Sequence, residues 1–239
     1  MSAERVAQRT ARLEAALGAR AVGLRLLAEN AWLPALLAVF GTCVAALLER
    51  EHGGFGAADR ALSGAALGVA LPLLAYAFFD AGLGNRRLRD AVAPIARHGA
   101  DARVAALGVL GALAGLLAAS GMLLACAAVL TSRRFTDPAL ARDLVASAWI
   151  GALAGLAYAG WFALASTLGR RGGARKWLLV VDFVLGATNG VLALPWPRGH
   201  VRNLLGGAPP LDLAQGVASL ALVAMTVITL LAALARTER

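Results

Sequence analysis

Apolar residues in this chain are gathered into separate blocks, each about long enough to cross a membrane. Of the 239 residues, 59% are hydrophobic, and the mean hydropathy is +0.70. Soluble domains contain roughly 45–50% apolar residues, whereas a membrane helix needs about 20 consecutive apolar residues to cross roughly 30 Å of hydrocarbon. The pattern therefore predicts an all-α, polytopic membrane protein.

The blocks predict six transmembrane helices. We expect the spans at about residues 31–48, 61–79, 104–130, 143–168, 177–194 and 213–235. Trp32 and Pro34 suit the start of the first span, where an interfacial aromatic residue and a helix-entry proline are both common. Residues 1–30 are then a cytoplasmic amphipathic helix, and residues 31–239 form one transmembrane domain.

The N-terminal segment, residues 3–29, is too polar and too long before its first apolar block for a signal peptide. Apolar positions recur there at helical spacing: Val6, Thr10, Leu13, Leu17, Ala21, Leu24 and Ala28. Five arginines are spread over the same segment: Arg5, Arg9, Arg12, Arg20 and Arg25. The stripe could pack on protein, but we favour a helix lying in the cytoplasmic membrane interface, because it leads directly into an apolar block.

The positive residues predict the orientation of the spans. The N-terminal segment, residues 80–103, the loop after the fourth span and the C-terminal tail together hold sixteen of the 23 Lys and Arg residues. Cytoplasmic loops carry this excess, so both termini are expected inside. A net charge of +9 could suggest nucleic acid, but nucleic-acid binders gather their basic residues on one face, and here these residues lie in the connections between spans. We therefore expect no nucleic-acid partner.

Several membrane-enzyme classes lack their residues here. The three histidines fall in predicted loops, no GxSG or HExxH motif is present, and Cys43 and Cys126 have no metal-site spacing. The one lysine, Lys176, is followed by Trp177, so there is no GxxxxGK[ST] phosphate loop either. We expect no catalytic residue, no metal site and no ATP hydrolysis in this chain.

Asp182 is the one acidic residue well inside a predicted span. Ionisable groups within the membrane are costly and often functional. The carboxylate could be hydrogen-bonded in the bundle, which we favour, or it could line a translocation path with Asn189, seven residues later on the same helix face.

The second connection, residues 80–103, predicts a short cytoplasmic helix with apolar residues and arginines around them. The candidate coupling residues are Arg86, Arg87, Leu88, Arg89, Val92, Ile95, Arg97 and His98. Such a helix could dock into a groove of a soluble partner, or it could be a solvated loop held by anionic lipid headgroups.

The last external connection, residues 192–212, contains four prolines and three glycines. These residues prevent one straight helix, so an external hairpin that partly re-enters the membrane and an ordered loop are both open. GxxxG spacings also occur in four spans and predict close helix packing: Gly64/Gly68, Gly111/Gly115, Gly151/Gly155 and Gly186/Gly190.

Together these features resemble the membrane subunit of an ABC transporter of the ABC-2 type. The matching segments are the amphipathic helix at residues 3–29, the coupling segment at 86–98 and the hairpin at 192–212. The resemblance is architectural and covers nearly the whole chain, although no large external domain is present.

The resemblance implies a permease subunit in the bacterial cytoplasmic membrane. It implies pairing with a second permease subunit, identical or similar, and with separate ABC ATPase subunits that bind ATP and Mg²⁺, so that this chain itself holds no cofactor. Residues 86–98 would then transmit force from the ATPase. The alternative function is a non-catalytic membrane anchor or assembly subunit of a larger complex.

Overall fold

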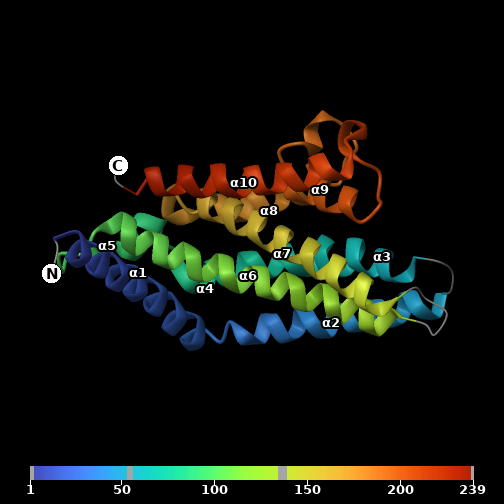
Figure 1. The fold of residues 1–239 in the computed structure, drawn as a ribbon, viewed down its shortest axis with the longest axis horizontal. Helices are drawn as coiled ribbons and strands as arrows, with labels where there is room; N and C mark the ends of the chain where they lie inside the picture. The colour runs from blue at the N-terminus through green and yellow to red at the C-terminus, as the bar shows by residue number, and fades with distance from the viewer. Residues whose placement is uncertain (1–2, 53–55, 134–138, 238–239) are drawn as a thin grey trace.

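The computed structural model describes residues 3–52, 56–133 and 139–237, with side chains from residue 7 onward. Within these ranges the chain forms helices and no strands. Long helices run side by side along one axis, and both termini lie at the same end, called here the terminal end (Figure 1). The elements are α1 (Ala3–Ala28), α2 (Trp32–His52), α3 (Ala57–Ala61), the π-helix η1 (Leu62–Ala70), α4 (Leu71–Leu83), α5 (Leu88–Ala96), α6 (Ala102–Ser132), α7 (Leu140–Ala165), η2 (Arg170–Gly172), α8 (Ala174–Leu185), η3 (Val191–Ala193), α9 (Pro197–Leu204), η4 (Pro210–Asp212) and α10 (Gln215–Ala235).

Five helical stretches in the described residues are long and apolar enough to cross a membrane. They are α2, the stretch Ala57–Ala96 that contains α3, η1, α4 and α5, then α6, α7 and α10. They correspond to the first four predicted spans and the sixth. The chain is therefore a multi-pass, all-helical membrane protein.

The fifth predicted span, residues 177–194, is not one continuous helix. α8 has 12 residues, about 18 Å at 1.5 Å per residue, which is too short to cross a bilayer. The helix ends at Gly186, where an added Cβ would lie 2.9 Å from the Cβ of Arg198. The chain then turns through η3 into α9, which packs against α7, α10 and η1. The predicted external hairpin is thus folded against the bundle, at the end opposite the termini (Figure 1).

α1 packs lengthwise on α6, and its contact face is made of small residues. An added Cβ at Gly18 would lie 2.1 Å from the carbonyl oxygen of Ala105, so the two backbones touch there. Leu13, Leu17 and Leu24 are 51–60% exposed. The leucine stripe therefore faces away from this chain's own bundle, while another face of α1 packs on α6.

Four positions counted in the sequence analysis, as arginines or as part of the apolar stripe, lie outside what the structure describes. The side chains of Arg5 and Val6 are not described, and neither are residues 134 and 239. The five arginines of residues 3–29 are thus represented by Arg9, Arg12, Arg20 and Arg25.

The GxxxG spacings have mixed outcomes. Gly151 and Gly155 lie where α7 crosses α6, and an added Cβ at Gly155 would be 2.2 Å from the carbonyl oxygen of Leu117. Gly111 and Gly115 have open space beside them instead. Spacing alone did not distinguish glycines at helix crossings from glycines on an open face.

Gly108→Ala should destabilise the protein, whereas Gly111→Ala should not. A Cβ at Gly108 would lie 1.9 Å from the carbonyl oxygen of Ala15, and overpacking typically costs about 1–3 kcal/mol. At Gly111 nothing lies within 4 Å, so the better helix propensity of alanine should leave stability unchanged or higher. Thermal unfolding of the two variants in detergent measures the difference, and equal melting temperatures would contradict the α1–α6 contact.

Candidate functional site

Arg175 joins the start of α8 to the end of α4 at the terminal end. Its side chain is only 2% exposed. Nη1 donates to the carbonyl oxygen of Phe79 at 2.6 Å, and Nη2 donates to that of Gly84 at 2.5 Å. Nε donates to the carbonyl oxygen of Gly172 at 3.1 Å, and a carboxylate oxygen of Asp80 lies 3.7 Å from Nη2. A cation at the carbonyl end of a helix satisfies acceptors that the helix leaves open.

The start of α5 is bonded to the connection between α7 and α8. The backbone N–H of Leu88 donates to the carbonyl oxygen of Ser166 at 3.1 Å. The Nε of Arg87 donates to the carbonyl oxygen of Gly169 at 2.7 Å. Through residues 166–175, α5 is therefore linked to the first turn of α8, 80 residues later in the sequence.

The predicted coupling residues divide between the two faces of α5. Leu88 and Val92 are buried, at 0% and 1% exposure, and Ile95 packs against the same core. Arg87 is half-buried, and the exposed residues are Arg86, Arg89, Arg97 and His98. The apolar side chains fill the bundle, so the structure corrects the expectation that they insert into a partner.

The outward side of α5 is a charged groove instead. It has a volume of about 380 Å³ and is lined by Asn85, Arg86, Asp90, Ala93, Pro94, Arg97 and Arg171. Its charged groups come from α5 and from the α7–α8 connection, so a ligand seated there would touch both linked segments.

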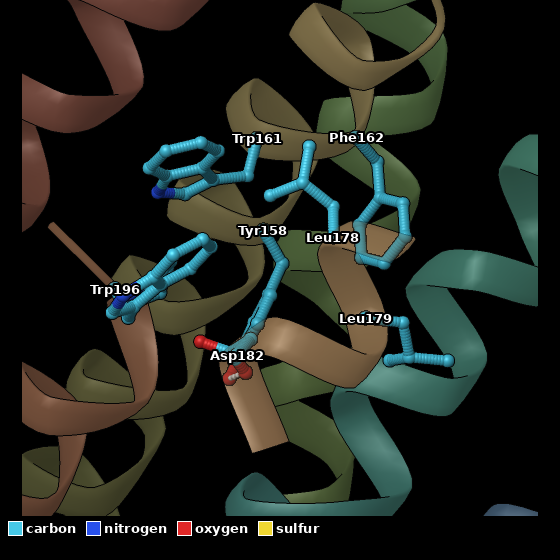
Figure 2. Close-up of a pocket in the computed structure, with 8 residues that line it drawn as sticks. Tyr158, Trp161, Phe162, Leu178, Leu179, Asp182 and Trp196 are labelled. Carbon is cyan, nitrogen blue, oxygen red and sulfur yellow. Dashed lines mark hydrogen bonds between the residues drawn. The ribbon is translucent and has the colours of Figure 1, made fainter. Parts of the chain in front are cut away.

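Asp182 is a buried carboxylate, 3% exposed, on α8. Its Oδ2 accepts a hydrogen bond of 2.9 Å from the hydroxyl of Tyr158 on α7, and Figure 2 shows the Tyr158 side chain pointing toward it. Its Oδ1 accepts from the backbone N–H of Arg198 at 3.4 Å. The carboxylate therefore ties α8 to α7 and to the start of α9, as the favoured sequence interpretation expected.

The surroundings of Asp182 are aromatic and closely packed. The rings of Trp161 and Trp196 stack with centroids 5.2 Å apart, beside Tyr158 (Figure 2). The remaining cavity is about 10 Å³, room for about one water molecule. The cavity beside Asp182 is therefore much smaller than a transported solute would need.

Asn189 does not share a helix face with Asp182, because α8 ends at Leu185. Its exposed Oδ1 accepts a 2.5 Å hydrogen bond from Nη2 of Arg202 on α9. Arg202 also donates to three backbone carbonyls of the turns on either side, those of Ala187, Thr188 and Ala208. Asn189 thus helps hold the segment predicted as an external hairpin, and it does not share a helix face with Asp182.

The sequence interpretation missed Arg175, Arg202 and Tyr158. The arginines were counted only as loop charges, and nothing in their spacing shows which carbonyls they reach. Tyr158 carried a weak signal, a hydroxyl inside an apolar span, which must find a partner when buried.

No group of three or more His, Cys, Asp or Glu side chains in the described residues could hold a metal ion. Comparisons with protein-family models, with curated proteins and with solved structures find no match for this chain. The function must therefore be argued from the site.

Arg175→Met should lower the melting temperature, and Lys176→Met should leave it unchanged. The first change leaves buried carbonyls without their donor, at roughly 1–3 kcal/mol for each unsatisfied group. Lys176 is the exposed neighbour, so its replacement is the matched control. Thermal unfolding in detergent is the measurement, and a wild-type melting temperature for Arg175→Met would contradict the assigned bonds.

Asp182→Asn should be tolerated, while Asp182→Leu should destabilise the protein. Asparagine keeps an oxygen that can accept from Tyr158. Leucine leaves the buried hydroxyl unpaired, which costs about 1–3 kcal/mol. Equal losses of melting temperature for the two variants would show that the negative charge itself, and not the hydrogen bond, is required.

Proposed function

We propose that this chain is the permease subunit of an ATP-driven exporter of the ABC-2 type, coupled to separate ATPase subunits. The observation that carries the proposal is the link between α5 and α8. A short helix between the apolar helices α4 and α6 presents a charged groove outward and is bonded at its start to the connection that leads into a broken membrane helix.

Such a link can transmit movement. A force applied to the outward side of α5 would pass through the bond between Leu88 and Ser166 to the α7–α8 connection, and through the bond between Gly172 and Arg175 to the first turn of α8. α8 ends deep in the bundle at Asp182 and Gly186, where it meets α7 and α9. Displacing α8 would open the closed packing around Tyr158, and this is the step that nucleotide binding on the partner would drive.

The proposal also accounts for the membrane arrangement. With the terminal end in the bacterial cytoplasm, α8 is a partial fifth crossing from that side, and residues 186–214 return from the outside to complete it. Irregular backbone at membrane depth must be buried in protein and satisfied there. The carbonyl oxygen of Leu213 accepts from the side chain of Asn203 at 2.8 Å, and Arg202 satisfies others. Broken helices of this kind are frequent in transporters.

A second permease subunit, identical or similar, completes the proposed complex. The outer side of α8 is apolar and exposed, with Trp177 at 72%, Val180 at 51% and Val184 at 62%. α1, with its leucine stripe turned outward, would lie at the cytoplasmic membrane interface. ATP and Mg²⁺ would bind on the ATPase, so that no reaction is catalysed by this chain.

The double variant Arg86→Glu/Arg97→Glu should abolish binding of the ATPase. It reverses two charges in the groove of α5 without touching a buried side chain. The matched control is Arg9→Glu/Arg12→Glu, which changes the same charge on the exposed side of α1. The measurement is recovery of an ATPase subunit with the tagged chain, purified in detergent from a host that also expresses the neighbouring genes, together with ATP turnover.

Recovery of the wild-type chain without any nucleotide-binding subunit would count against the transporter and favour an anchor or assembly subunit. Equal ATPase recovery by both variants would show that the groove of α5 is not the contact.

A further inference from the structure

Three arginines from two distant parts of the sequence line a second cavity at the terminal end. The cavity has a volume of about 230 Å³ and is lined by Arg87, Arg89, Thr167 and Arg236. These residues belong to the start of α5, to the turn after α7 and to the residue after α10. Among the residues that the structure describes, the lining contains three guanidinium groups and no carboxylate, and Asp90 lies 3.5 Å from Nε of Arg89 as an exposed ion pair. Such exposed ion pairs contribute little.

The depth of this cavity follows from the helices that end beside it. α7 ends at Ala165 and α10 at Ala235, and both are apolar enough to cross the membrane. Thr167 and Arg236 are therefore among the first residues beyond the hydrocarbon, at the level of the lipid headgroups. Because the hydroxyl of Thr167 already donates to the carbonyl oxygen of Leu164 at 2.7 Å, the other side-chain donors of this described lining are the guanidinium groups, of which Arg87 also donates through Nε to the carbonyl oxygen of Gly169.

An apolar surface adjoins the arginines. On α10, Val227, Ile228 and Leu231 are 50–65% exposed in the turns before Arg236. Leu168, next to Thr167, is also exposed. A ligand that fits both surfaces carries a negative headgroup and hydrocarbon chains, and this combination distinguishes a phospholipid from a soluble phosphate.

We propose that this cavity is a binding site for one anionic phospholipid of the leaflet at the terminal end, with its phosphate among Arg87, Arg89 and Arg236 and its acyl chains along α10. Guanidinium groups bind phosphate oxygens through charge-assisted, often bidentate hydrogen bonds. The lipid would join α5 to α10 at this end of the bundle. This inference holds equally for a permease and for an anchor.

The test measures binding of phosphatidylglycerol, with phosphatidylcholine as the neutral comparison, to the full chain purified in detergent without an ATPase. Native mass spectrometry of stepwise lipid addition gives the affinities. Arg89→Gln/Arg236→Gln should bind phosphatidylglycerol at least about tenfold more weakly, because each substitution removes part of the electrostatic attraction to the anionic headgroup. Arg86→Gln/Arg97→Gln, which removes the same charge from the neighbouring groove, should bind as the wild type does.

The other outcomes would overturn the site. Equal weakening by both double variants would mean a general attraction between positive protein and anionic lipid, and no weakening would mean that the cavity is not occupied. Displacement of phosphatidylglycerol by millimolar inorganic phosphate would assign the arginines to a soluble phosphate ligand. If the first double variant unfolds, Arg236→Gln against Arg97→Gln gives the same comparison, with melting temperatures measured for both.

Discussion

A helix that breaks inside a membrane protein leaves backbone carbonyls with no water to satisfy them, and arginine side chains meet that requirement here. Arg175, in the first turn of α8, donates to the carbonyl oxygens of Phe79, Gly84 and Gly172. Arg202 donates to three carbonyl oxygens in the turns that follow the end of α8. These bonds, together with the packing of α8 and α9 on their neighbours, hold the short α8 and the segment after it against the bundle. The rest of the site depends on this arrangement.

The same bonds relate the fold to the proposed function. Leu88 ties α5 to the turn after α7, and Arg175 ties the start of α8 to Gly172 and to the end of α4. At the inner end of α8, Asp182 is held by two hydrogen bonds in a closed aromatic packing. A gate that is opened by force requires a connection that transmits the force and a closed state that can be opened. The bonds at the start of α8 and the closed packing around Asp182 fit these two requirements, and the proposed permease function rests on this fit.

The sequence predicted the apolar spans well, because a membrane helix is defined by composition over about 20 residues. It could not predict where α5 turns its apolar face. Leu88, Val92 and Ile95 fit a partner groove and a bundle core equally well, since both offer apolar surface. Likewise, glycine spacing marked Gly151/Gly155 and Gly111/Gly115 alike, although a neighbouring backbone lies against only the first pair. The surface that each residue contacts decides these cases, and the local sequence does not specify that surface.

The sequence by itself determined that this chain is an all-helical, multi-pass membrane protein and that prolines and glycines interrupt residues 192–212. For Asp182 it favoured a hydrogen-bonded carboxylate but left a translocation path open. Only the tertiary structure decided that α8 stops at Leu185, that Asn189 bonds to Arg202 and not toward Asp182, and that the arginines divide into carbonyl donors and cavity-lining groups. Hydrophobicity is a sum over local residues, whereas a guanidinium group's role depends on which distant acceptors the packing brings within 3 Å or so of it.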